Sequence, residues 1–142
     1  MENNRLIRIS TGGSRKATAW QENEILWSDF TEKFRTPIRG PETLEEYLRF
    51  PKAKQDDLKD VGGFVGGTLR DGRRKASCVE ERDLVTLDLD EIPAGKTEDI
   101  LKRVSGLGCA ALVYSTRKHA GYAPRLRIVI PLDRPASADE YE

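Results

Sequence analysis

The fold is decided by Leu84-Val85-Thr86-Leu87-Asp88-Leu89-Asp90, an apolar run that ends in two aspartates. A short run of Leu, Val and Thr between charged residues is typical of a β-strand. Successive side chains of a strand point to opposite faces, so we expect Asp88 and Asp90 to share one face. By the same argument, Leu87 and Leu89 point the other way, into a core.

The two aspartates predict a metal site. Neighbouring carboxylates repel each other unless a cation lies between them. Oxygen ligands of this kind suit Mg²⁺ or Mn²⁺, which hold the attacking and leaving oxygens in nucleotidyl transfer. The alternative is a solvated pair at a strand end, but Asp is disfavoured in strands. We therefore expect Asp88 and Asp90 to be catalytic metal ligands, with Glu91 either a further ligand or part of a turn with Pro93.

The segments that follow complete the order strand, helix, strand, strand, helix. Apolar residues at helical spacing predict a helix over residues 97–104, and a second strand follows over 109–115. After a polar loop, a third strand runs over 125–130 and stops at Pro131, and Ser137 then caps a helix. These are five elements of the RRM-like, or ferredoxin-like, β-α-β-β-α-β unit.

We therefore expect an α+β fold with an RRM-like core over residues 83–142. The final strand of that unit is absent, so the core is expected to be C-terminally incomplete and the chain to be a fragment of a longer protein. Residues 1–82 are expected to form an N-terminal α/β extension that packs on the core within one domain. This extension includes a strand over 6–10, a helix from about 28 to 35, and a polar, solvated stretch over 52–60.

Arg125 and Arg127 share a face of the third predicted strand. In the β-α-β-β order the first strand lies beside the third, which brings these arginines near the aspartates. Guanidinium groups beside metal-binding carboxylates suit a nucleoside triphosphate; the alternative is the solvent face of an amphipathic strand. His119, the single histidine, lies in the preceding loop and is a further nucleotide-binding candidate; the alternative is an ordinary surface residue.

A second basic cluster, Arg73, Arg74 and Lys75, lies shortly before the strand that carries the aspartates. Lys and Arg side chains supply most contacts to nucleic-acid phosphates, so these residues are candidates for template binding. The alternative is a charged hairpin tip at Asp71-Gly72.

The bulk composition limits the class of protein. Lys plus Arg and Asp plus Glu both number 24, so a basic field over the whole molecule is absent. The chain has no apolar run of membrane-spanning length and no signal peptide, so we expect a cytoplasmic location.

Cys78 and Cys109 form no Cys-x-x-Cys pair, so both are expected in the core. Trp20 and Trp27 are expected there too, rather than stacked on bases.

Four segments carry a resemblance to a known family. They are Gly72-Arg73-Arg74-Lys75, the run that ends in Asp88-Leu89-Asp90, Tyr114-Ser115-Thr116, and Pro124-Arg125-Leu126-Arg127-Ile128-Val129-Ile130-Pro131-Leu132. They resemble the archaeo-eukaryotic primase superfamily, and more narrowly the N-terminal region of phage and prophage replication proteins of the virulence-associated-protein-E type. The resemblance covers most of the chain and is strongest from residue 62 onward.

The resemblance implies part of a DNA primase-polymerase whose first motif binds Mg²⁺ or Mn²⁺ through Asp88 and Asp90. It also implies a DNA template, nucleoside triphosphates and a helicase domain in the parent protein as partners. The family's second motif, Ser-x-His, contacts the nucleotide, but here Arg127 holds the place of that histidine and His119 lies in the loop before it. The third motif, another acidic ligand, is not recognisable before residue 142, so this fragment alone is expected to be inactive.

Two other functions are compatible with the same residues. An RRM-like sheet also serves as a non-catalytic nucleic-acid-binding module, although Tyr114 is the one aromatic candidate on its strands. Asp-x-Asp after an apolar strand also begins haloacid-dehalogenase-type phosphatases, where Asp88 would be the nucleophile. That motif normally lies close to the N-terminus and continues with Thr or Val where this chain has Ile92.

Overall fold

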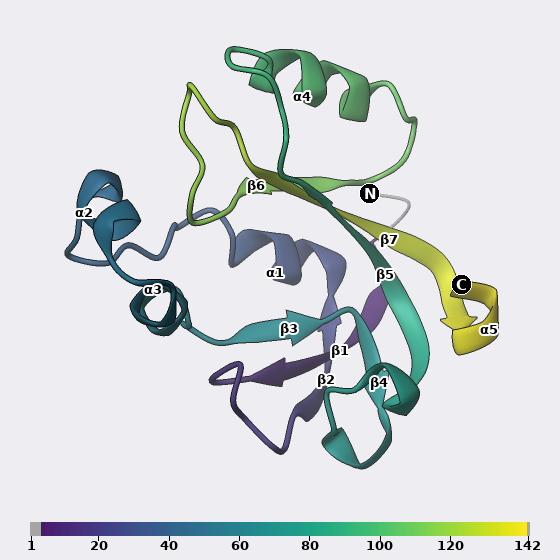
Figure 1. Ribbon diagram of the computed structural model, residues 1–142. Coiled ribbons are helices and arrows are strands. Elements are labelled where there is room, and N and C mark those ends of the chain that lie inside the picture. The colour runs from purple at the N-terminus through teal and green to yellow at the C-terminus, as the bar shows by residue number, and fades with distance from the viewer. Residues whose placement is uncertain (1–3, 142) are drawn as a thin grey trace.

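The computed structural model of the protein describes residues 4–141, which form two antiparallel sheets (Figure 1). The first sheet has the order β2-β1-β3 and contains β1 (Leu6–Gly12), β2 (Gln21–Leu26) and β3 (Gly63–Val65). The second has the order β4-β5-β7-β6 and contains β4 (Gly67–Leu69), β5 (Val79–Leu89), β6 (Leu112–Ser115) and β7 (Leu126–Ser137).

The helices lie around and between these sheets. They are α1 (Trp27–Glu32), α2 (Leu44–Arg49), α3 (Lys52–Leu58), α4 (Thr97–Ser105) and α5 (Ala138–Tyr141). α1 lies between the two sheets, and α4 lies on the opposite side of the second sheet (Figure 1). Within residues 4–141, no helix is long and apolar enough to cross a membrane.

The core lies where α1 meets both sheets. Its buried members are Ile7 and Ile9 of β1, Trp27 and Phe30 of α1, Leu84 of β5 and Val129 of β7. Alternate residues of β1 point into this core because strand side chains alternate between faces. The expectation for the tryptophans is confirmed, since Trp20 and Trp27 are both buried. The expectation for the cysteines holds for Cys78 and is wrong for Cys109, which is exposed.

The predicted α+β class is confirmed, and the second half has the predicted element order β5-α4-β6-β7-α5. β7 pairs with both β5 and β6, so the first strand of this half does lie beside the third. β4 comes from the first half of the chain and pairs with the other edge of β5. The assignment to an RRM-like primase core and the division of the chain at residue 82 stay predictions.

Three local expectations are wrong. Leu87 does not enter a core, because its side chain is 46% exposed. β6 begins at Leu112 rather than at Cys109. Pro131 does not end its strand, since β7 continues to Ser137. Proline is tolerated there because β6 pairs with β7 only as far as Val129, and the register against β5 shifts just beyond Pro131.

The polar stretch over residues 52–60 is mostly exposed, as expected, and most of it forms α3. Lys52 and Asp56 form an ion pair of 2.6 Å at the i, i+4 spacing that supports a helix. Gln55 is buried, and its Nε2 donates to the carbonyls of Leu48 at 3.4 Å and Phe50 at 3.0 Å. These tertiary contacts at the end of α2 explain why a largely polar segment is ordered.

Candidate functional site

Three side chains from three strands form one row across the second sheet. The register places Asp88 of β5 opposite Arg127 of β7, and Arg127 opposite Tyr114 of β6. Arg127 Nε donates to Asp88 Oδ1 at 2.6 Å, and Nη2 approaches Oδ2 at 3.5 Å. Arg127 Nη1 donates to the Tyr114 hydroxyl at 3.2 Å. The expected closeness of Asp88 and Arg127 is therefore found.

Arg127 is a permanent cation in this row. Burial of the guanidinium disfavours its charge, but the hydrogen bonds to Asp88 and Tyr114 outweigh this and raise the pKa of Arg127 above its ordinary value. The side chains of Arg127 and Asp88 are 36% and 54% exposed, and pairs this open to solvent contribute only about 0–1 kcal/mol to stability. The pair therefore orients a cation and an anion at the surface rather than stabilising the fold.

Tyr114 has a larger part in this site than the sequence indicated. Its ring packs on Phe34, just beyond the end of α1, with 4.6 Å between ring centroids. The Arg127 guanidinium lies 5.8 Å from the centroid of the same ring. Phe34 gave no sequence signal, because it lies 80 positions from Tyr114 in the chain. The aromatic pair supports Arg127 from the side away from Asp88.

Asp90 lies one residue beyond the end of β5 and is exposed. Asp88, Asp90 and Glu91 border one open hollow of about 370 Å³, with an apolar wall that includes Leu89 and Ile100. Within residues 4–141, no group of three or more His, Cys, Asp or Glu side chains is arranged to hold a metal ion. Mg²⁺ is often bound by one or two carboxylates together with substrate phosphates and water. The donors at this hollow fit an ion bound jointly with a nucleotide.

His119 and Arg125 lie in and at the end of the loop that joins β6 and β7. His119 Nδ1 accepts the backbone N–H of Arg125 at 3.1 Å, so in neutral His119 the proton is on Nε2. If the pairing of β5 with β7 continued by one residue, Arg125 would lie opposite Asp90, but the last paired residue of β5 is Leu89. Within the described part of the chain, neither His119 nor Arg125 makes a side-chain bond to Asp88 or Asp90.

The same loop is fixed to the segment before α2. Arg117 Nη2 donates to Glu42 Oε1 at 3.0 Å, and its guanidinium lies 4.0 Å from the centre of the Tyr47 ring. The backbone N–H of Glu42 and the Arg117 guanidinium hold the pKa of Glu42 below its ordinary value. The Glu42 side chain is 7% exposed. Sequence reasoning missed this contact, because 75 positions separate the two residues.

The second predicted cluster, Arg73, Arg74 and Lys75, lies in the connection between β4 and β5. It is at the opposite end of β5 from Asp88. Because a strand rises roughly 3.3 Å per residue, the length of β5 separates the cluster from Asp88 by about 30 Å. The sequence-predicted residues therefore form two separate groups, one at each end of β5.

Comparison with known families gives a match over the whole chain. The family model for the VapE N-terminal domain matches the chain over residues 1–142. No curated protein and no solved structure matches the chain.

Proposed function

The chain belongs to the VapE N-terminal domain family, and we propose that it forms part of the nucleotidyl-transfer site of a DNA primase-polymerase in phage or mobile-element replication. The observation that carries the proposal is the row of Asp88, Arg127 and Tyr114 beside the hollow that Asp88, Asp90 and Glu91 border. A carboxylate suited to a metal ion, Asp88, thus contacts a permanent guanidinium suited to phosphate, Arg127.

The carboxylates and phosphates would share the divalent ion. Asp88 and Asp90 would hold Mg²⁺ or Mn²⁺, which in nucleotidyl transfer neutralises charge on the nucleotide and activates a 3′-hydroxyl. Asp88 has capacity for this role, because Arg127 approaches Oδ1 closely and Oδ2 only at 3.5 Å. A carboxylate has about four lone-pair sites, so one guanidinium contact does not exhaust it.

Arg127 takes two positions in this proposal. Without nucleotide it compensates the charge of Asp88. When phosphates arrive with the metal ion, the guanidinium exchanges Asp88 for a phosphate group, two oxygens of which can accept its N–H groups in the same bidentate way. Tyr114 keeps its bond to Nη1 and limits how far the side chain moves.

Residues of the loop between β6 and β7 would add further contacts to the nucleotide. Arg125 adds a second guanidinium, and His119 in its neutral form presents Nε2–H as a donor because Nδ1 is occupied by the Arg125 backbone. The contact of Arg117 with Glu42 fixes the loop that carries both. Preorganised donors of this kind lose little entropy when the nucleotide binds.

The experiment is incorporation of labelled nucleotides on a primed DNA template with Mn²⁺ or Mg²⁺, using the longest natural polypeptide that contains this chain. Replacement Asp90→Asn is expected to nearly abolish incorporation, because it removes a charged metal ligand. Asp133→Asn is the matched control, since Asp133 is an exposed aspartate on β7 outside the site. Full activity of the Asp90→Asn protein would contradict the proposed function.

A further inference from the structure

Two loops far apart in the chain are joined into one surface. The loop between β1 and β2 meets the connection between β4 and β5. The Trp20 backbone N–H donates to the Gly72 carbonyl at 2.7 Å. Arg74 Nη2 donates to the Arg15 carbonyl at 3.3 Å, and the Arg74 guanidinium lies 5.2 Å from the centre of a Trp20 ring. The two loops therefore hold a fixed relative position.

Two glycines permit this close approach. Gly72 has a φ of +65°, and a Cβ on it would lie 2.7 Å from the Trp20 carbonyl oxygen. A Cβ on Gly12 would lie 2.6 Å from the Trp20 ring. A larger residue at Gly72 would separate the two loops, whereas one at Gly12 would displace the Trp20 ring within its own loop.

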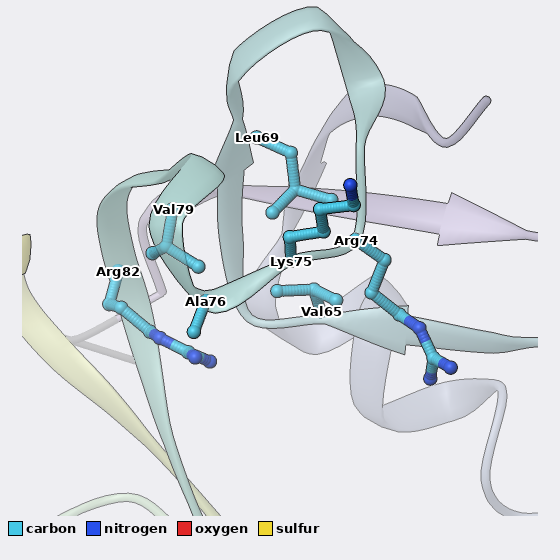
Figure 2. Close-up of a pocket in the computed structure, with 7 residues that line it drawn as sticks. All are labelled: Val65, Leu69, Arg74, Lys75, Ala76, Val79 and Arg82. Atoms are coloured by element: carbon cyan, nitrogen blue, oxygen red, sulfur yellow. The ribbon is translucent and has the colours of Figure 1, made fainter. Parts of the chain in front are cut away.

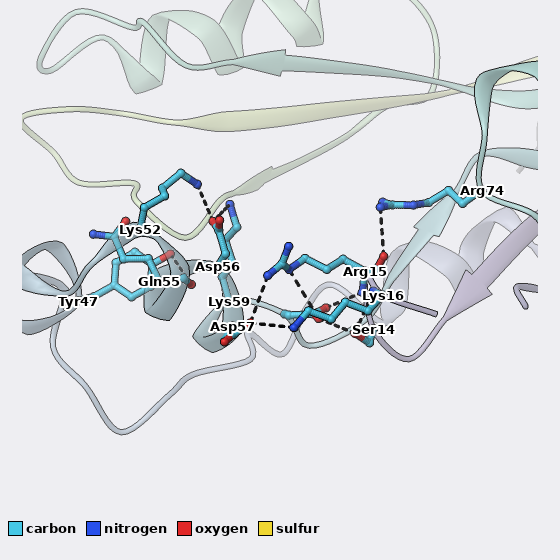
Figure 3. Close-up of polar contacts among 11 residues, drawn as sticks. Ser14, Arg15, Lys16, Tyr47, Lys52, Gln55, Asp56, Asp57, Lys59 and Arg74 are labelled. Carbon is cyan, nitrogen blue, oxygen red and sulfur yellow. Dashed lines mark hydrogen bonds and ion pairs between the residues drawn. The ribbon is translucent and has the colours of Figure 1, made fainter. Parts of the chain in front are cut away.

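The joined loops carry six exposed cations, which we call the two-loop surface. They are Arg15, Lys16, Arg70, Arg73, Arg74 and Lys75. Arg15 and Lys16 are partly neutralised by Asp57 at the end of α3, at 3.1 and 3.5 Å (Figure 3). In the described part of the chain, the other four have no carboxylate within ion-pair distance. A local positive surface therefore exists on a chain whose net charge is zero.

Arg73, Arg74 and Lys75 have different positions on this surface. The backbone at Arg73 and Lys75 is extended, so neighbouring side chains point to opposite sides. Figure 2 shows Lys75 and Arg74 pointing apart. Arg74 is engaged between the loops, whereas the described residues give the Arg73 and Lys75 side chains no hydrogen-bond partner. We therefore assign Arg73 and Lys75 as the contact residues and Arg74 as a positioning residue.

A small hollow at the edge of the two-loop surface supplies an independent observation. It has a volume of about 210 Å³ and is lined by Arg74, Lys75, Arg82 and apolar side chains that include Val65 and Leu69 (Figure 2). Arg82 Nε is buried and has no hydrogen-bond partner within residues 4–141. A buried donor without a partner costs about 1–3 kcal/mol. The guanidinium also lies 4.7 Å from the centre of the Tyr141 ring, and because Arg82 lines the hollow, an anion there would lie beside a permanent cation.

We propose that the two-loop surface binds the phosphate backbone of nucleic acid, with one phosphate at Arg82. This deepens the proposed function, on which the choice of nucleic acid rests, by locating a contact surface at the opposite end of β5 from Asp88. Guanidinium and ammonium groups supply most phosphate contacts in such complexes. An acidic protein fits less well, because protein interfaces centre on exposed aromatic or apolar residues. The aromatic residue here, Trp20, is 6% exposed and is already packed.

The test is fluorescence anisotropy of a labelled 20-base-pair DNA duplex, titrated at several salt concentrations with EDTA present. EDTA makes the result independent of any metal at Asp88 and Asp90. The variant is Arg73→Gln with Lys75→Gln. The matched control is Lys102→Gln with Arg103→Gln, which removes one Lys and one Arg that are exposed on α4.

The double variant at Arg73 and Lys75 is expected to bind at least about tenfold more weakly at roughly 100 mM salt. The slope of log K against log salt is expected to fall by about two, one for each lost phosphate contact. The affinity of the control is expected to stay within about twofold of that of the unmodified chain, because salt largely screens charges that lie away from the binding surface. Circular dichroism and melting temperature check that both variants fold.

Arg82→Gln tests the hollow separately and is expected to lower the slope by about one. Two results would overturn the proposal. One is an unmodified chain that shows no saturable binding to the duplex at low salt. The other is an equal loss of affinity in the double variant and in the control, which would show that only the total charge matters.

Discussion

At the scale of single residues, Arg127 is the side chain that relates the candidate metal ligands to the candidate phosphate site. It contacts Asp88 on one side and Tyr114 on the other, and it remains charged at every accessible pH. A cation beside a metal ligand opposes metal binding when no nucleotide is present. The same cation favours metal binding together with phosphates.

Replacement Arg127→Met should therefore have opposite effects on two ligands. Mn²⁺ alone should bind more tightly, by roughly fivefold or about 1 kcal/mol, because the competing pair with Asp88 is lost. Nucleoside triphosphate with Mn²⁺ should bind more weakly, because a guanidinium contact is lost. Isothermal titration calorimetry measures both affinities. A change of the same sign for both ligands would contradict the role given to Arg127.

The pair of Glu42 and Arg117 should make stability depend on pH. The pKa of Glu42 is lowered in the folded state, so its contribution is present above the ordinary pKa and is lost as pH falls through the lowered value. The difference in melting temperature between the unmodified chain and Glu42→Gln should be largest near neutral pH and shrink in acid. Glu45→Gln, an exposed first-turn residue of α2, is the control and should show a small difference throughout.

The sequence predicts the Asp88 and Arg127 neighbourhood well, because strand periodicity and strand order are sufficient to place both residues. It does not predict the Arg117 contact with Glu42, the Phe34 contact with Tyr114, or the His119 bond. Each of these depends on a loop conformation or on contacts between distant segments, for which a single sequence carries no periodic signal.

At the scale of secondary-structure elements, β5 and its preceding connection carry both candidate surfaces. The strand itself was predicted from residue 84 onward, but it begins at Val79. Its early part contains Glu80, Glu81 and Arg82, which gave no hydrophobic pattern. Pairing with β4 and with the end of β7 forms this part of the strand, so tertiary contacts override local preference.

Gly72→Ala should destabilise the chain and separate the two loops. An L-residue at positive φ costs about 1–2 kcal/mol, and the added Cβ also meets the Trp20 carbonyl at 2.7 Å. Gly121→Ala is the control, since its Cβ would meet no atom within 4 Å and its φ is not positive. Thermal unfolding monitored by circular dichroism compares the two variants. Equal melting temperatures would show that the close approach of the loops is not needed.

At the scale of the whole molecule, one buried carboxylate connects the two sheets. Asp83 of β5 has a side chain that is 4% exposed and pairs with Arg5 at 3.1 Å. It also accepts the backbone N–H of Arg8 in β1. Arg5 in turn donates to the Leu132 carbonyl of β7 at 2.6 Å. The first and second sheets should therefore unfold together.

Asp83→Ala should lower the free energy of unfolding by about 3–5 kcal/mol, since it leaves a partly buried Arg5 and an amide without their partner. Asp133→Ala, at an exposed aspartate, should change it by less than about 0.5 kcal/mol. Urea unfolding followed by tryptophan fluorescence and by circular dichroism gives both values. Separate transitions for the two probes in the unmodified chain would contradict the single cooperative unit.

The most direct test of the proposed site is calorimetric titration of a nucleoside triphosphate into the 142-residue chain, with Mn²⁺ and with EDTA. We expect binding in Mn²⁺ that is lost in EDTA and in Asp90→Asn, and that is retained in Asp133→Asn. Binding that is equally strong in EDTA, or that is unchanged in Asp90→Asn, would contradict a metal and nucleotide site at the end of β5.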